Sequence, residues 1–258
     1  MTGVAVLTLD LGNTSASVAL VDRGGAHLLA SMPVGDLDGA ALEACLQRSA
    51  PRPTRAAVSA VGDPATERRV CGALEALGLD VSCNPDPGME LRIDHPETCG
   101  RDRLYAALGA VEGIPEFYDP DGLVVIDAGT AVTVDAVSLS PLAFLGGAIA
   151  PGPGTLAASL SQAGARLPEF EVRPDVNALG RSTEEALRAG VVVGFRGAVR
   201  DLCATIAAEA FGPTATVAAV LTGGAREFAR AGVAAGLKGA PREEPLLVHI
   251  GLAAALNP

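Results

Sequence analysis

Apolar and polar positions follow the same order twice along this chain of 258 residues. In the first half, short apolar runs typical of strands alternate with segments that have the period of helices. The predicted strands span residues 4–9, 16–21 and 56–61, and the predicted helices span residues 37–48 and 65–77. This alternation predicts an α/β fold.

The second half repeats the pattern after a loop at residues 113–122. Its predicted strands span residues 123–126, 132–137 and 216–221, and its predicted helices span residues 154–165 and 183–208. The loop contains Pro, Asp and Gly, so we place a domain boundary there, between residues 1–117 and 118–258. The simplest architecture is two duplicated α/β halves with a cleft between them.

Both halves contain a turn in which a strand ends in an aspartate, followed by a glycine and a threonine. The first copy reads Asp10-Leu11-Gly12-Asn13-Thr14, and the second reads Asp127-Ala128-Gly129-Thr130. Aspartate holds Mg²⁺ directly or through water, glycine lets backbone N–H groups approach phosphate oxygens, and threonine donates a hydroxyl. A single copy is also an ordinary way to end a strand. Two copies, each between strands, indicate two half-sites for one nucleotide.

Composition narrows the choice of partners. Nineteen basic residues against thirty acidic ones give a net charge of −11, which disfavours nucleic acid or a membrane surface as the main partner. No apolar run approaches the roughly 18 residues that span a bilayer, and residues 1–10 lack the features of a signal peptide. We therefore expect a cytoplasmic protein.

The five cysteines lie at irregular spacings, without the CxxC pair of many zinc or redox sites. They are Cys45, Cys71, Cys83, Cys99 and Cys203. This pattern favours buried thiols.

Seven segments occur in an order and spacing that resemble the type III pantothenate kinases. They are residues 10–14 (DLGNT), 58–61 (VSAV), 100–103 (GRDR), 127–133 (DAGTAVT), 146–152 (GGAIAPG), 179–183 (LGRST) and 221–224 (LTGG). That family belongs to the acetate kinase, sugar kinase, Hsp70 and actin superfamily. The resemblance runs nearly end to end and implies two ribonuclease H-like (actin-like ATPase) domains with a nucleotide cleft between them.

The resemblance also implies an activity. It is the ATP-dependent phosphorylation of pantothenate on its primary hydroxyl, the first step of coenzyme A biosynthesis. Mg²⁺, a monovalent cation such as K⁺ or NH₄⁺, and a homodimer belong to the same expectation.

Roles for individual residues follow from the same resemblance. Asp102 corresponds to the general base, and Arg103 binds substrate with Gly100, Arg101 and, across the dimer interface, Thr183. By the same resemblance, Asp10 binds Mg²⁺ and Asp127 binds the monovalent cation. The residues implied in ATP binding are Asp10, Leu11, Gly12, Asn13, Thr14, Gly129, Thr130, Thr133, Gly223 and Gly224. Phosphoryl transfer needs an in-line hydroxyl, charge neutralisation and a carboxylate that can take the proton, which suits this set.

Several of these residues also have an ordinary structural explanation. Asp102 can cap a helix predicted over residues 102–111, a role worth about 1 kcal/mol, and Ser182 or Thr183 can cap the helix that follows it. Gly223 and Gly224 fit a left-handed turn equally well. Residues 146–152 resemble a loop near substrate, although tight packing also explains their glycines. The histidines at positions 95 and 249 have no partner at metal-binding spacing, and we take them as incidental.

The chain departs from the family pattern in three places. Residues 91–95 (LRIDH) stand where relatives often carry an aromatic residue that contacts pantothenate, Arg101 replaces a small or apolar residue, and residues 246–252 lack the usual acidic residue. Two other functions therefore stay open. One is a related kinase acting on another small hydroxyl substrate, and the other is a non-catalytic regulator that kept the fold.

Overall fold

The computed structural model describes residues 5–113, 120–163 and 167–256. They form two compact units. The first comprises Met1–Glu90, Asp94–Pro115 and Leu246–Pro258, and the second comprises Leu91–Ile93 and Glu116–Pro245. The boundary expected between residues 117 and 118 lies outside the described residues and stays a prediction.

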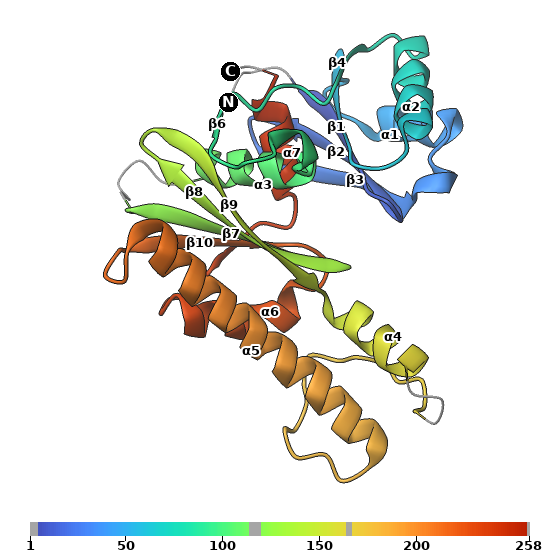
Figure 1. Cartoon of the computed structure of the whole chain (residues 1–258). Helices are drawn as coiled ribbons and strands as arrows, with labels where there is room; N and C mark the ends of the chain where they lie inside the picture. The colour runs from blue at the N-terminus through green and yellow to red at the C-terminus, as the bar shows by residue number, and fades with distance from the viewer. Residues whose placement is uncertain (1–4, 114–119, 164–166, 257–258) are drawn as a thin grey trace. The chain divides into compact units, whose positions relative to one another are not determined.

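The first unit contains a five-stranded sheet in the order β3-β2-β1-β4-β5 (Figure 1). The strands are β1 (Val6–Leu11), β2 (Ser15–Asp22), β3 (Gly25–Pro33), β4 (Arg55–Ala60) and β5 (Asp80–Cys83). The helices are α1 (Gly39–Arg48), α2 (Pro64–Ala76), α3 (Arg101–Glu112) and α7 (Leu247–Ala254), with short 3₁₀ turns at Val34–Asp36 and Pro96–Thr98. Because β1 is antiparallel to β2 and parallel to β4, the carboxyl ends of β1 and β4 meet at one edge.

Alternate residues of β1 enter different environments, as the period of a strand requires. Leu7, Leu9 and Leu11 belong to a buried apolar cluster with residues of α1 and α2. Thr8 and Asp10 lie on the opposite face, and α7 packs against β1. The aspartate predicted to bind phosphate and metal is therefore on the face away from that apolar cluster.

Helices α3 and α7 approach each other at two glycines. A Cβ atom on Gly109 would overlap the carbonyl oxygen of Leu247, and a Cβ atom on Gly251 would overlap the carbonyl oxygen of Tyr105. This close packing fixes the helix that carries Asp102 against the helix that carries His249.

The second unit contains a six-stranded sheet in the order β11-β10-β7-β8-β9-β6. The strands are β6 (Glu90–Leu91), β7 (Gly122–Ala128), β8 (Ala131–Leu139), β9 (Leu142–Pro151), β10 (Val217–Thr222) and β11 (Arg242–Glu243). The helices are α4 (Pro153–Ala163), α5 (Thr183–Phe211) and α6 (Arg226–Gly236). Alternate residues of β7 pack with α5 and α6 in a second apolar cluster that includes Val124, Ile126 and Phe195.

The periodic segments of the sequence form the predicted strands and helices, with ends that shift by at most three residues. The expectation of a loop at residues 146–152 is wrong, because Gly146 to Pro151 lie in β9. A Cβ atom on Gly147 would overlap the carbonyl oxygen of Val134 and the side chain of Asp135, so tight strand packing accounts for this glycine.

The expectation of buried thiols is also wrong for three of the cysteines. Cys71 and Cys83 form a disulfide, whereas Cys45 and Cys203 are buried thiols and Cys99 is a partly exposed one. Burial raises the pKa of Cys203 to about 12, which keeps this thiol protonated.

Candidate functional site

Asp10 lies near the end of β1 in a row of hydroxyl side chains. Its register partners are Ser17 on β2 and Ser59 on β4. Side chains at paired register positions share a face of the sheet, with Cβ atoms about 5 Å apart. Oδ1 of Asp10 is buried, and Ser59 Oγ is buried without a hydrogen-bond partner among the described residues. The row therefore presents oxygen atoms to any ligand bound at this edge.

The first predicted phosphate turn follows this row directly. The backbone N–H of Gly12 donates to the carbonyl oxygen of Ser15, 3.0 Å away, which closes the turn between β1 and β2. Asn13 and Thr14 are exposed at its tip. The turn borders a cavity of about 190 Å³ within the first unit, and the lining residues are Leu11, Gly12, Asn13, Val34, Ala60, Gly62, Asp63, Thr66 and Glu67.

The residues of α2 that line this cavity were not predicted from the sequence. Asp63 caps α2 by accepting a hydrogen bond from the N–H of Ala65 at 3.1 Å, and Thr66 and Glu67 lie in the first turn of the helix. Their proximity to Gly12 follows from topology, because parallel strands β1 and β4 end at the same edge and the ligands of such sheets bind beyond the carboxyl ends.

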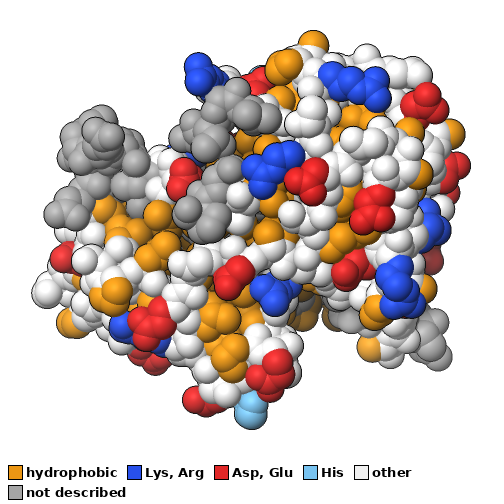
Figure 2. All heavy atoms as spheres, turned by 90° about the horizontal axis from the view of Figure 1, so that it is seen from above, with side chains coloured by type: hydrophobic (Ala, Val, Ile, Leu, Met, Phe, Trp, Pro, Cys, Tyr) orange, Lys and Arg blue, Asp and Glu red, His pale blue; other side chains and the backbone are white. Residues whose placement is uncertain are grey.

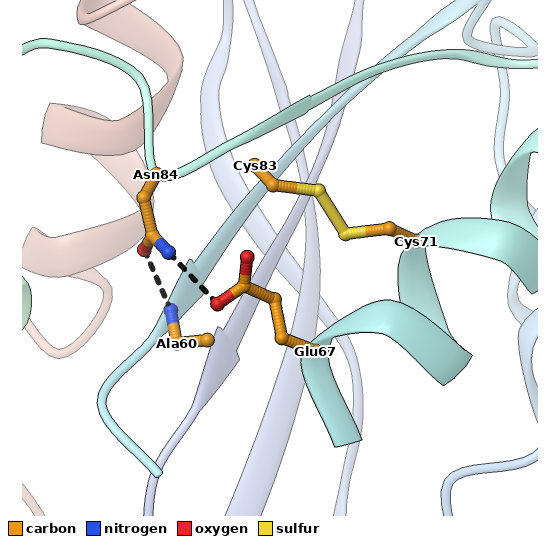
Figure 3. Close-up of a disulfide and its surroundings, with 5 residues drawn as sticks. All are labelled: Ala60, Glu67, Cys71, Cys83 and Asn84. Atoms are coloured by element: carbon orange, nitrogen blue, oxygen red, sulfur yellow. Dashed lines mark hydrogen bonds between the residues drawn. A yellow bond between two sulfur atoms is a disulfide. The ribbon is translucent and has the colours of Figure 1, made fainter. Parts of the chain in front are cut away.

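The wall of the cavity is tied to β5 by two neighbouring links (Figure 3). Asn84 donates from Nδ2 to Glu67 Oε2 at 3.1 Å and accepts from the N–H of Ala60 at 3.0 Å. One helical turn after Glu67, the Cys71–Cys83 disulfide joins α2 to the end of β5. The disulfide thus restrains the segment that positions Glu67.

Asp102 lies in the first turn of α3 but does not cap it. The N-cap position belongs to Gly100, and Asp102 Oδ1 accepts from the N–H of Arg103 at 2.9 Å. A Cβ atom on Gly100 would overlap Oδ1 of Asp102, so this carboxylate position requires a glycine two residues earlier. The capping explanation for Asp102 is therefore wrong, and the carboxylate lies in the positive potential of a helix start.

The neighbours of Asp102 differ in exposure. Arg101 is exposed, whereas Asp102 and Arg103 are partly buried. Tyr105, one turn further along, is fully buried and donates its hydroxyl to the carbonyl oxygen of Pro85 at 2.7 Å. Burial raises the pKa of this tyrosine well above its usual value. Tyr105 therefore anchors the start of α3 to the segment that follows β5.

Asp127 occupies the corresponding position in the second unit. Its register partners are Thr133 on β8 and Thr222 on β10, in place of the two serines. Gly129 donates to the carbonyl oxygen of Ala131 at 2.8 Å, which closes a turn like the first one but one residue shorter. The structure thus brings Asp127, Gly129, Thr130 and Thr133 together, as predicted.

Glycines surround this second turn. Gly223 follows β10 with φ of 92°, and a Cβ atom there would overlap Oδ1 of Asp127 and the carbonyl oxygen of Ala128. Gly152 is packed in the same way against the carbonyl oxygen of Gly129. Gly223 is therefore both a left-handed turn residue and an immediate neighbour of Asp127, while Gly224 is exposed beside it.

Thr183 is the first residue of α5 and is exposed. The cap is Ser182, whose hydroxyl oxygen accepts from the N–H of Glu185 at 3.2 Å, while Glu185 Oε2 accepts from the N–H of Arg181 at 2.7 Å. Of the two capping residues considered, the structure selects Ser182. The hydroxyl of Thr183 is not the capping group.

The oxygen atoms around Asp10 fit an Mg²⁺ ion that is also coordinated by the phosphates of a nucleotide. Among the described residues, no group of three or more His, Cys, Asp or Glu side chains is arranged to hold a metal. Mg²⁺ in phosphoryl-transfer enzymes is held through one or two carboxylates, phosphate oxygens and water. A single carboxylate beside the buried Ser59 hydroxyl suits this arrangement, and the oxygen atoms of Asp127, Thr133 and Thr222 suit a hard cation in the second unit.

On the face shown in Figure 2, basic and acidic side chains are interspersed. Within the described ranges, no helix is long and apolar enough to cross a membrane.

A family model and two relatives of similar sequence carry the same description. A family model described as type III pantothenate kinase matches residues 6–205. The type III pantothenate kinase of Halorhodospira halophila is 37% identical over 257 residues, which cover 95% of each chain. That of Thermus thermophilus is 35% identical over 218 residues, which cover 80% of this chain and 83% of the relative.

Similar solved structures share the fold at low sequence identity. A protein from Campylobacter jejuni, described as a conserved Baf family transcriptional activator, has a TM-score of 0.58 with 20% identity and covers 97% of this chain and 96% of its own. A glucokinase from an Antarctic psychrotroph has a TM-score of 0.50 with 13% identity and covers 99% of each chain. At these identities the likeness supports the fold, two ribonuclease H-like domains of the actin-like ATPase and sugar kinase kind.

Proposed function

This chain belongs to the type III pantothenate kinase family, and we propose that it transfers the γ-phosphoryl group of ATP to the primary hydroxyl of pantothenate. The observation that carries the proposal is the match to the family model over residues 6–205, together with the paired aspartate turns of the two units. The product is 4′-phosphopantothenate, the first intermediate of coenzyme A biosynthesis.

The side chains of the first unit supply the catalytic carboxylate and a metal site. Asp102 accepts the proton of the pantothenate hydroxyl as that oxygen attacks phosphorus. Its contact with the backbone of Arg103 and the helix start holds the carboxylate in place. Asp10 would hold Mg²⁺, and the exposed tip of the turn at Asn13 and Thr14 would approach the phosphates with its backbone N–H groups. When bound, the metal neutralises charge on the phosphate oxygens.

The second unit provides the remaining ATP contacts and the monovalent cation site. Asp127 and Thr133 offer oxygens to K⁺ or NH₄⁺, and Gly129 and Thr130 contact phosphate. Gly223 and Gly224 let the backbone approach the adenosine. We assign these roles from the residue types, from the glycine contacts and from the family motifs.

The substrate is recognised by cationic and polar groups. Arg103 offers a guanidinium fork to the pantothenate carboxylate, with Gly100 and Arg101 beside it. Thr183 adds a hydroxyl at the start of α5, which would complete the site of a partner subunit in a homodimer. We further propose that the enzyme acts in the cytoplasm.

The variant Asp102→Asn tests the assignment of the base. Removing a general base costs roughly 10²- to 10⁴-fold in kcat, whereas the affinity for ATP and the melting temperature should stay near those of the wild type. Glu112→Gln, at the far end of the same helix, is the matched control and should keep full activity. Near wild-type turnover by Asp102→Asn would refute the role of Asp102 as base.

The same assay separates the alternative functions. A regulator that kept the fold would bind ATP without pantothenate-dependent ADP release. A kinase for another substrate would release ADP only with that other hydroxyl compound.

A further inference from the structure

His249 links β1 and β2 of the first unit close to Asp10. It lies on α7 and is 3% exposed. Its Nδ1 is 2.9 Å from Thr8 Oγ1 on β1, and its Nε2 is 2.9 Å from Ser17 Oγ on β2. The sequence interpretation of this histidine as incidental is therefore wrong, because both ring nitrogens have side-chain partners.

The hydrogen bonds of Thr8 determine which ring nitrogen carries the proton. Thr8 donates its hydroxyl proton to the carbonyl oxygen of Ala19, 3.2 Å away. A hydroxyl has only one proton to donate, so while this bond is formed Thr8 Oγ1 accepts from His249, and Nδ1 carries the ring proton. In a neutral ring the other nitrogen, Nε2, is then an acceptor. Ser17 therefore donates its proton to His249.

The ring stays neutral under physiological conditions. Burial lowers the pKa of His249 to about 4. The tautomer is thus set by the hydrogen-bond chain from Ala19 through Thr8 and His249 to Ser17.

This chain of bonds has a consequence at Asp10. Ser17 is the register partner of Asp10 and is only partly buried. With its proton committed to His249, Ser17 Oγ can only accept hydrogen bonds, and an ionised aspartate likewise only accepts. Two acceptors side by side suit a cation and the water molecules it carries, which are donors.

We propose that His249 is a positioning residue which holds Ser17 as a hydrogen-bond acceptor beside Asp10, on the β2 side of a site for hydrated Mg²⁺. The inference rests on the proposed function only for the identity of the nucleotide and metal. If the tautomer were reversed, Ser17 would have a proton to donate to Asp10 and would compete with the cation.

The first test is spectroscopic and needs no activity. The ¹⁵N chemical shifts of the His249 ring in the wild-type protein at neutral pH report which nitrogen is protonated. A protonated Nδ1 and a bare Nε2 are expected. A protonated Nε2 would overturn the proposal.

The second test measures how much Mg²⁺ strengthens ATP binding. Calorimetry gives the affinity for ATP with Mg²⁺ and with excess EDTA, in the absence of pantothenate. In Ser17→Ala and His249→Asn we expect the ratio of the two affinities to fall about three- to tenfold, the effect of one hydrogen bond. Thermal unfolding checks that both variants fold, and His249→Gln replaces His249→Asn if the latter does not fold.

The controls distinguish a relay from a general loss of structure. Ser31→Ala changes the exposed serine that pairs with Ser17 on β3, and its ratio should match the wild type. The double variant Ser17→Ala/His249→Asn should lose no more than either single variant, because both act through one oxygen. An unchanged ratio in His249→Asn would overturn the proposal. Wild-type protein that binds MgATP but does not phosphorylate pantothenate would refute the proposed function alone.

Discussion

The two aspartate turns occupy the same position in two sheets but are surrounded by different groups. Asp10 and Asp127 each lie between an antiparallel partner and a parallel one. Serines pair with Asp10, and the buried His249 is hydrogen-bonded to one of them, Ser17. Threonines pair with Asp127, and the backbone of Gly223 lies directly against its carboxylate.

In the proposed mechanism, this difference divides one reaction between the two units. The first unit offers side-chain oxygens and a cavity bounded by α2, which suits a hydrated metal and the transferred phosphate. The second unit offers glycines and backbone groups, which suit close approach to ATP. The common register fixes where each aspartate lies, and the neighbouring residues decide what it binds.

The largest expected effect comes from exchanging each aspartate for its amide. Asp10→Asn should lower kcat/KM by roughly 10²- to 10³-fold, as expected when charge stabilisation of the transition state is lost, and should raise the Mg²⁺ concentration needed for half-maximal activity. Asp127→Asn should instead change the dependence on K⁺ and leave the Mg²⁺ requirement near that of the wild type. Titration of both cations against initial rates checks this, and identical responses of the two variants would remove the distinction between the units.

The next largest effect is expected from a chemical change confined to the first unit. Reduction of the Cys71–Cys83 disulfide, which spans 12 residues, should lower the free energy of unfolding by about 3 kcal/mol. Urea unfolding with and without a dithiol reductant measures the difference. Cys71→Ser/Cys83→Ser should be as unstable as the reduced protein and insensitive to reductant, and a response of that variant would assign the effect to another cysteine.

His249 should make the stability of the first unit depend on pH. Its folded pKa of about 4 lies below the ordinary value of 6.5, so protonation favours the unfolded state. The stabilisation is present in full above pH 6.5 and is lost as the pH falls toward 4, a change on the order of 3 kcal/mol. Denaturant unfolding at several pH values checks this against His249→Asn. Parallel curves for the two proteins would exclude a contribution from His249.

The smallest effect separates structure from binding at the start of α5 in the second unit. Ser182→Ala removes the cap and should cost about 1 kcal/mol of stability with little change in the KM for pantothenate. Thr183→Ala should leave stability nearly unchanged and raise that KM. Unfolding curves and initial rates on the same two proteins distinguish capping from substrate binding. An unaltered KM in Thr183→Ala would exclude this threonine from substrate binding.

The sequence predicts the elements whose side chains alternate between core and solvent. It does not predict the edge strand β3, whose side chains are only partly buried or exposed and form no apolar run. Strand β9 contains Gly146 and Gly147, which favour a loop until their packing is known. Helix α7 is almost fully buried, so it has no polar face that would reveal its period.

The predicted half-sites are found where strands end, because the motif residues are consecutive in the chain. The additional groups come from distant segments. His249 is 241 residues from Thr8 and 232 from Ser17, and Glu67 reaches the first turn only because β1 and β4 are parallel neighbours. The disulfide likewise joins a helix face to a strand end that sequence spacing does not pair. Tertiary structure, rather than local pattern, brings these groups together.

Pantothenate kinase activity is tested most directly by ADP release from the purified protein with ATP and Mg²⁺, with and without pantothenate and K⁺, and with the product identified by mass. ADP release should depend on pantothenate, fall when K⁺ is omitted and yield phosphopantothenate. Bound ATP with no release in the presence of pantothenate would contradict the proposed activity.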